Sequence, residues 1–234
     1  MKNNILLLFS TFIITGAILA QDTEVATSEV DTKYREDQFY IGVTYNLLSD
    51  KPDGVDLRGV SGGISFGYLR DMPLNQQRNI AIALGAGLAI DQYGQNLFIG
   101  EDTNENTIFR ALGSTVDFDT NRLSMATLEV PFEFRWRSST ATDYNFWRVY
   151  FGIKTGYVYW YRSNFKQPNN DVAQTDIPEF EQLRMGATLA FGYSTFNFYA
   201  YYSLNPFFKD AQTIDTQEEV SLKTIKLGII FYIL

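Results

Sequence analysis

The sequence of 234 residues contains no cysteine and no histidine. Without cysteine, the protein has no thiolate catalysis, no disulfide, no cysteine-ligated zinc and no lipidated N-terminal cysteine. Without histidine it has no Ser-His-Asp triad and no imidazole metal site, and the commonest general base near neutral pH is missing. Most hydrolytic chemistry is therefore excluded, and we expect neither an enzyme nor a cofactor.

Positive charge is also scarce. Lys and Arg number 19 against 27 Asp and Glu, which gives a formal net charge of −8 and argues against a nucleic-acid partner. In contrast, aromatic residues make up 16% of the chain, and there are 17 glycines. This composition favours a β-rich envelope protein over a soluble enzyme.

A long hydrophobic run occurs only at the N-terminus. Lys2 precedes an apolar stretch over residues 5–19, and small residues lead to Gln21, which predicts a signal peptide over residues 1–20. The alternative is a single transmembrane anchor, but the stretch is shorter than the roughly 20 residues that a spanning helix needs. Residues 21–37 are polar and acidic, and we expect them to form a flexible periplasmic tail.

From Gln38 onward the sequence alternates between apolar and small or polar residues, which is typical of strands. In the clearest run, Ile80, Ile82 and Leu84 alternate with Ala81 and Ala83. Eight such runs cover residues 38–48, 59–70, 78–91, 127–137, 147–159, 182–193, 196–204 and 224–233. We therefore predict an all-β fold over residues 38–234, an eight-stranded antiparallel up-and-down transmembrane β-barrel.

The alternation alone does not say which face meets solvent, and a soluble lipocalin-like barrel is the alternative. Strands of about ten residues match the 9–11 that cross a bilayer at a tilt. Charges in mid-strand, such as Glu133 and Lys154, suit a polar lumen and not a lipid face. Short connections alternate with longer ones, as in outer-membrane barrels. Aromatic residues near strand ends suggest interfacial girdles: Trp136, Trp147, Tyr157, Tyr159, Trp160, Tyr161, Phe196, Tyr202 and Phe231.

The charged residues on the polar faces are the one constellation that suggests a site. They are predicted to form a lumen charge network of Glu129, Glu133, Arg135, Arg137, Arg148, Lys154, Arg184 and Lys226. One interpretation is a selectivity ring or proton path. The other, which we favour, is a salt-bridged plug, because side chains can fill the interior of an eight-stranded barrel. The Gly, Ala and Ser faces of residues 59–70 and 78–91 would leave room for long side chains.

The longer connections are acidic and predict an acidic outer surface. Asp102, Asn104 and Asn106 imitate the start of a calcium loop, but Thr107 and Gly113 stand where glycine and a bidentate glutamate are required, so we expect a solvated loop. The acidic residues of these connections are Asp50, Asp53, Asp56, Glu101, Asp102, Glu105, Asp117, Asp119, Asp171, Asp176, Glu179, Asp210, Asp215, Glu218 and Glu219.

Several stretches carry a family resemblance. They are residues 34–40 (YREDQFY), 59–67 (GVSGGISFG), 67–75 (GYLRDMPLN) running into 78–82 (RNIAI), and 231–234 (FYIL). With them the sequence resembles the PorT-like outer-membrane β-barrel proteins of the Bacteroidota. The resemblance implies a role in protein export by the type IX secretion machinery, and it implies no catalytic residues.

We expect the chain to lie in the lipid of the bacterial outer membrane with both termini periplasmic. Three functions remain open. The first is an accessory or assembly component of an envelope export machinery, with a protein partner. The second is a structural or surface-binding barrel whose loops contact cations, lipopolysaccharide or a host surface. The third is a narrow porin.

Overall fold

The computed structural model describes residues 37–138 and 146–233, and these residues form a closed β-barrel. The predicted signal peptide lies outside the described residues, as does the predicted tail apart from Asp37. The strands are β1 (Gln38–Ser49), β2 (Gly62–Pro73), β3 (Ile80–Gly94), β4 (Leu97–Glu101), β5 (Thr107–Ala111), β6 (Thr120–Arg137), β7 (Trp147–Gln167), β8 (Asn170–Gln174), β9 (Leu183–Tyr193), β10 (Phe196–Ser203) and β11 (Lys223–Ile233). No helix in the described part of the chain is long and apolar enough to cross a membrane.

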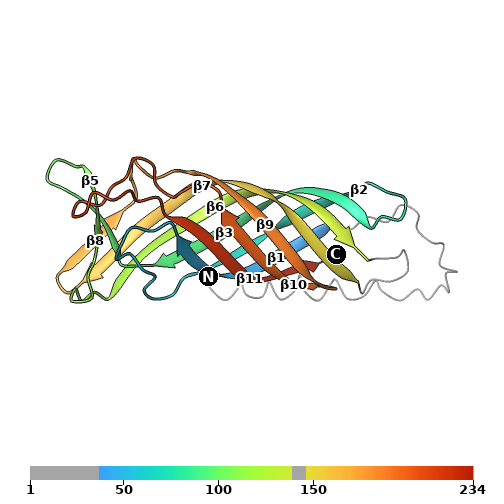
Figure 1. The fold of residues 1–234 in the computed structure, drawn as a ribbon, viewed down its shortest axis with the longest axis horizontal. Helices are drawn as coiled ribbons and strands as arrows, with labels where there is room; N and C mark the ends of the chain where they lie inside the picture. Colours follow the sequence, from blue (N-terminus) through green and yellow to red (C-terminus); the bar gives the residue numbers. More distant parts are fainter. Residues whose placement is uncertain (1–36, 139–145, 234) are drawn as a thin grey trace, which may run out of the picture. The chain divides into compact units, whose positions relative to one another are not determined.

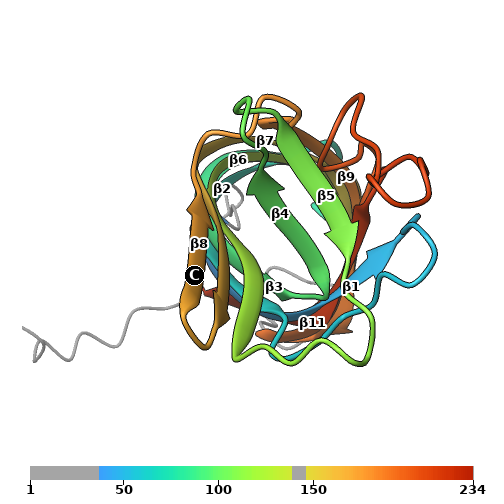
Figure 2. The same cartoon turned by 90° about the vertical axis from the view of Figure 1, so that its left-hand side faces the viewer.

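Eight of the strands make the barrel wall. They pair antiparallel in the order β6-β3-β2-β1-β11-β10-β9-β7, and pairing of β6 with β7 closes the ring. Figure 1 shows these strands side by side, and Figure 2 shows them as a ring. The predicted fold class, a closed eight-stranded antiparallel barrel, is confirmed.

The two ends of the barrel differ. Strand β1 begins and β11 ends at the same end, where Phe39 pairs with Ile233. This end also carries the β2–β3, β6–β7 and β9–β10 connections, and we call it the short-turn end. The opposite, long-loop end carries the other four connections. There β4 and β5 pair with each other across the mouth of the ring, and β8 extends the edge of β7 (Figure 2).

Two strands extend well beyond their predicted ends. Strand β6 begins at Thr120 and β7 continues to Gln167, so both rise into segments predicted to be loops. A register shift opposite Ala126 and Thr127 leaves Tyr159 as an extra residue in β7. Because of this β-bulge, the neighbours Tyr159 and Trp160 both point outward and Tyr161 points inward. Tyr161 is therefore not part of an outward aromatic girdle, contrary to the prediction.

The apolar faces of the strands point outward. On β6 the outward residues from Leu128 to Trp136 are apolar, and Leu128, Val130 and Phe132 are each about half exposed. At about 3.3 Å per residue and a tilt of about 40°, this segment rises about 20 Å, close to the ~25 Å apolar band of outer-membrane barrels. The inward face carries the polar and small residues, so the predicted assignment of the two faces is correct.

Candidate functional site

The interior of the barrel holds all eight residues of the predicted lumen charge network. Seven of them are buried, and the side chain of Lys226 is 12% exposed. Strands β6 and β7 supply six of the eight, because the inward positions of these two strands are occupied by charged residues where β2 and β3 have glycine or alanine. The charged side chains lie in layers along the barrel axis, which follow from the strand register.

The layer nearest the short-turn end centres on Asp71 of β2. Its carboxylate accepts hydrogen bonds from Arg137 at 3.1 and 2.9 Å, and from Nη1 of Arg135 at 3.2 Å. Nε of Arg135 donates to Glu133 at 3.0 Å. All four side chains are almost completely buried. Charge-assisted bonds of this kind, one of them bidentate, fix the geometry of the layer.

Two tyrosines complete this layer: Tyr150 of the neighbouring strand β7, which is paired with Arg135, and Tyr232 of the more distant β11. The Arg135 guanidinium lies over the ring of Tyr150, 4.8 Å from its centroid, and 5.7 Å from that of Tyr232. The Tyr232 hydroxyl donates to Glu133 at 3.2 Å. The planar cation is thus held between carboxylates and aromatic faces, both of which favour positive charge.

Two further layers each contain one lysine and one carboxylate. In the middle layer Nζ of Lys154 lies 2.9 Å from Glu129 and faces the rings of Tyr40 and Tyr199 at 5.6 and 5.3 Å. The third layer, closer to the long-loop end, has Lys226 bonded to Asp91 at 2.5 Å. The other oxygen of Asp91 accepts from Nδ2 of Asn46 at 2.9 Å, and Tyr201 lies 5.1 Å from Lys226.

The remaining two predicted residues have different surroundings. Arg148 lies over the ring of Phe146 at the short-turn end, 4.5 Å from the centroid. Arg184 donates to the backbone carbonyls of Pro206 at 2.8 Å and Phe207 at 3.3 Å, and also to that of Glu181. Arg184 therefore ties the barrel wall to the loop backbone, instead of joining the carboxylate layers.

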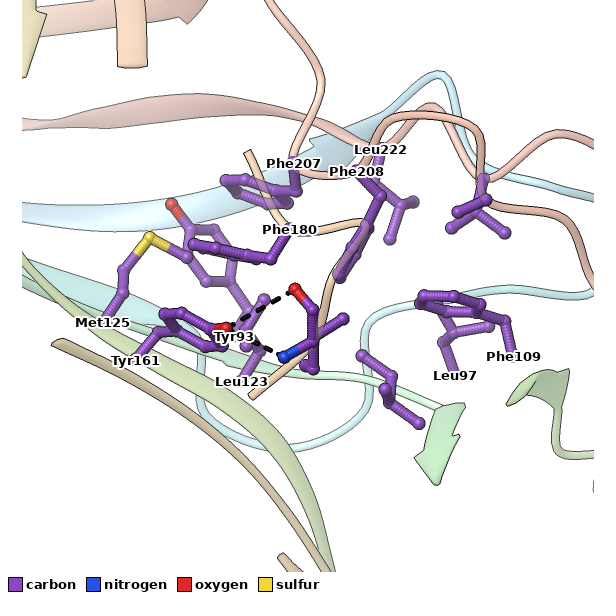
Figure 3. Packing of buried hydrophobic residues seen from close by; sticks show 14 of the residues in the cluster. Tyr93, Leu97, Phe109, Leu123, Met125, Tyr161, Phe180, Phe207, Phe208 and Leu222 are labelled. Carbon is purple, nitrogen blue, oxygen red and sulfur yellow. Dashed lines mark hydrogen bonds between the residues drawn. The ribbon is translucent and has the colours of Figure 1, made fainter. Parts of the chain in front are cut away.

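An apolar cluster lies next to Arg184 at the long-loop end, and the Arg184 guanidinium is 5.5 and 5.0 Å from the ring centroids of Phe180 and Phe207. Figure 3 shows how the residues of this cluster pack. We call this cluster the cap. It combines inward residues of the barrel strands, such as Tyr93 and Leu123, with residues of the long connections. Tyr161 stacks on Phe180 at 4.1 Å between ring centroids, and the Tyr161 hydroxyl accepts from the backbone N–H of Ile177 at 2.9 Å. Phe109 packs edge-on against Phe208 at 5.0 Å.

Little space remains among the charged layers. The two cavities that Glu129, Lys154 and Lys226 help to line have volumes of about 20 and 10 Å³. A cavity needs roughly 10–15 Å³ to hold one water molecule. The tyrosines fill the rest, and glycines accommodate them. At Gly87 and Gly186, added Cβ atoms would overlap Tyr40 and Tyr201, respectively.

Sequence analysis missed two carboxylates of these layers, Asp71 and Asp91. Asp91 lies two residues beyond Ala89 on the inward face of its run. The alternation of that run could therefore have identified Asp91 as a lumen residue. Asp71 lies one residue beyond the predicted run 59–70, but β2 continues to Pro73 and keeps Asp71 in line with the inward Leu69. The tyrosines were missed because their partners come from strands distant in sequence.

Residues 102–106, whose sequence is similar to the start of a calcium loop, form the turn between β4 and β5. One oxygen of Asp102 accepts from the backbone N–H groups of Asn104 at 2.8 Å and Asn106 at 2.9 Å, and the Asn106 side chain donates to the same carboxylate. These hydrogen bonds, chiefly those from Asn106, lower the pKa of Asp102. Within residues 37–138 and 146–233, no group of three acidic side chains is arranged to hold a metal ion.

A known family model covers most of the chain. The family model of the outer membrane protein beta-barrel domain matches residues 19–209. Among solved structures, the chain is similar to Ail, the attachment invasion locus protein of Yersinia pestis, solved in complex with the heparin analogue sucrose octasulfate. The two are 17% identical, with a TM-score of 0.40, and the match covers 85% of this chain and 98% of Ail. No curated protein matches the chain.

Proposed function

We propose a function for this chain from the premise that it belongs to the outer membrane protein beta-barrel domain family and is a small bacterial outer-membrane β-barrel. The protein acts through contacts with other envelope molecules, and it neither conducts solutes nor catalyses a reaction. The proposal includes a packed lumen that solutes do not cross. The contacts are then made by the two ends of the barrel, by its loops and by residues 21–37.

The observation that carries the proposal is the filled interior. Three layers of buried ion pairs stand one above another, and the cavities beside them hold about one water each. The cap lies over the layers at the long-loop end. A conducting pore would need these side chains to leave their partners, at a cost of several kcal/mol for each stranded charge.

The same interior argues against catalysis. Each of the four buried carboxylates Asp71, Asp91, Glu129 and Glu133 already lies against an arginine or lysine. A general acid or base needs a substrate within hydrogen-bond reach, and neither cavity is large enough for a substrate. We therefore propose a structural role for the lumen charge network.

We propose that the short-turn end faces the periplasm and the long-loop end faces outward, as is usual for outer-membrane barrels. Both termini of the barrel then lie on the periplasmic side, because β1 begins where β11 ends. The acidic segment 21–37 would accordingly extend into the periplasm, where a protein partner can reach it.

As its role we propose an accessory or assembly component of an envelope export machinery of the type IX kind. The resemblance to the PorT-like proteins supports this role, and a barrel without a pore is compatible with a scaffold. The experiment is a deletion strain whose medium and periplasm are compared with the parent by quantitative proteomics. Cargo retained in the periplasm supports the proposal, and an unchanged secretome contradicts it.

A second candidate is a structural or surface-binding barrel with no transport role. It is favoured by the acidic long connections, which carry 15 Asp and Glu residues but only Lys51, Arg58, Arg110, Lys166 and Lys209 as basic residues. For this role we expect loop-dependent binding to cations or surfaces together with a normal secretome. A strain that keeps residues 21–37 but lacks residues 102–106 separates the two candidates.

A further inference from the structure

A polar hollow lies on the outside of the barrel where β6 and β7 approach the long-loop end. It has a volume of about 340 Å³ and is lined by Arg122, Ser124, Trp160, Arg162, Asn164 and Lys166. In the strand register Arg122 faces Asn164, Ser124 faces Arg162, and Ala126 faces Trp160. These pairs form a grid of outward-pointing side chains on two neighbouring strands.

The hollow lies at the edge of the outward apolar band. Along β7 the outward residues change from Tyr157, Tyr159 and Trp160 to Arg162 within two positions. The outward face of β6 changes more gradually, from Leu128 through Ala126 and Ser124 to Arg122. Because tyrosine and tryptophan mark the level of the lipid headgroups in membrane proteins, the basic residues of the hollow lie at that level or just beyond it.

The charges in the hollow are open to a ligand. Arg122 and Arg162 are exposed, and no carboxylate within residues 37–138 and 146–233 forms an ion pair with either guanidinium. Lys166 has Asp171 at 3.8 Å, and both side chains are at least half exposed. Arg122 and Arg162 are diagonal neighbours across the two strands, which places their Cβ atoms about 7–8 Å apart.

We propose that this hollow binds the phosphate of a lipid headgroup, with the acyl chains of that lipid lying on the adjoining apolar face of β6 and β7. Arginine recognises phosphate with two parallel hydrogen bonds, and Ser124 and Asn164 add neutral donors between the two guanidinium groups. The apolar band beginning at Leu128 favours a lipid over a soluble anion. The proposal requires the membrane location, and it is independent of the export role.

The test is binding of defined lipids to the full mature chain purified in a neutral detergent, measured by native mass spectrometry. The probes are bisphosphorylated lipid A, dephosphorylated lipid A with the same acyl chains, and inorganic phosphate as a competitor. The variant is Arg122→Gln with Arg162→Gln. The matched control is Arg70→Gln with Arg110→Gln, because Arg70 faces outward near the short-turn end and Arg110 pairs with Asp215 in the loops.

We expect the unaltered chain and the control to bind bisphosphorylated lipid A at least about tenfold more tightly than the variant does. Dephosphorylated lipid A should bind all three alike. Equal binding of the phosphorylated lipid by variant and control would overturn the proposal, as would inorganic phosphate displacing the lipid completely. Neither outcome bears on the export role, which the secretome of the deletion strain tests separately.

Discussion

Asp71 and Arg137 form a bidentate ion pair across the inner surface of β3, with N–O distances of 3.1 and 2.9 Å. The two residues lie on β2 and β6, which flank β3 in the sheet. The pair can form because β3 presents the small residues Ala81 and Ala83 at this level, and both alanines are completely buried. Small inward side chains on one strand thus let long ones from its neighbours meet.

We expect Asp71→Asn to destabilise the barrel by about 3–5 kcal/mol, because it leaves Arg135 and Arg137 without the carboxylate that they share. Urea unfolding in lipid vesicles measures the change in free energy. The exposed acid Asp176 offers a matched control, and Asp176→Asn should leave stability unchanged. Equal stability of the two variants would show that the Asp71 layer contributes nothing.

The pair of Lys154 and Glu129 should behave as a coupled unit. Lys154→Met or Glu129→Leu alone strands a buried charge, and each should cost about 3–5 kcal/mol. The double variant removes both charges and should be close to the unaltered chain in stability, because an apolar pair of similar volume replaces the ion pair. A double-mutant cycle from unfolding free energies measures this coupling. Simple addition of the two single effects would contradict it.

Gly186 provides the space that Tyr201 occupies. An added Cβ at Gly186 would overlap the Tyr201 ring, so Gly186→Ala should destabilise by about 1–3 kcal/mol through overpacking. In a double-mutant cycle, Gly186→Ala should cost less in a Tyr201→Ala background than in the unaltered chain, because the overlapping ring is then absent. Gly113→Ala is the control, because the space around Gly113 is open and its φ is not positive. If Gly186→Ala costs the same in both backgrounds, the overlap with Tyr201 is not the cause.

Asp102 should order the β4–β5 turn without affecting the barrel. Its pKa is lowered by hydrogen bonds from Asn106 and Asn104, so the ionised carboxylate stabilises the turn above the carboxyl's ordinary pKa. This stabilisation should be lost as pH falls through the lowered pKa. We expect Asp102→Ala to raise amide hydrogen exchange at residues 101–107 near neutral pH while β6 stays protected. Unchanged exchange in the turn would contradict this assignment.

The sequence predicted the barrel well because alternation repeats along each strand. In all eight barrel strands parity separated the two faces, the charges in mid-strand indicated which face points inward, and the glycine and alanine faces indicated a space for long side chains. Strand ends were less predictable. The alternation of inward and outward residues is interrupted by the β-bulge at Tyr159. The part of β7 after Tyr159 could therefore not be predicted as a continuation of the part before it.

The cap was beyond prediction for a different reason. Phe109, Phe180, Phe207 and Phe208 come from three connections distant in sequence, where no periodic pattern identifies a buried residue. Their burial depends on the connections meeting over the mouth of one barrel. The predicted set of partners for the lumen charges was likewise incomplete, because Asp71 meets Arg137 only when β2, β3 and β6 are aligned in register.

The central claim is that the lumen is closed by its own ion pairs and not by the cap alone. Single-channel recording in planar bilayers tests it with the unaltered chain and with a cap variant, Phe180→Ala with Phe208→Ala. We predict no unitary conductance from either protein, because the layers of Asp91, Glu129 and Asp71 remain paired below the cap. Stable conductance steps from the unaltered chain would contradict the account, and steps from the cap variant alone would assign the closure to the loops.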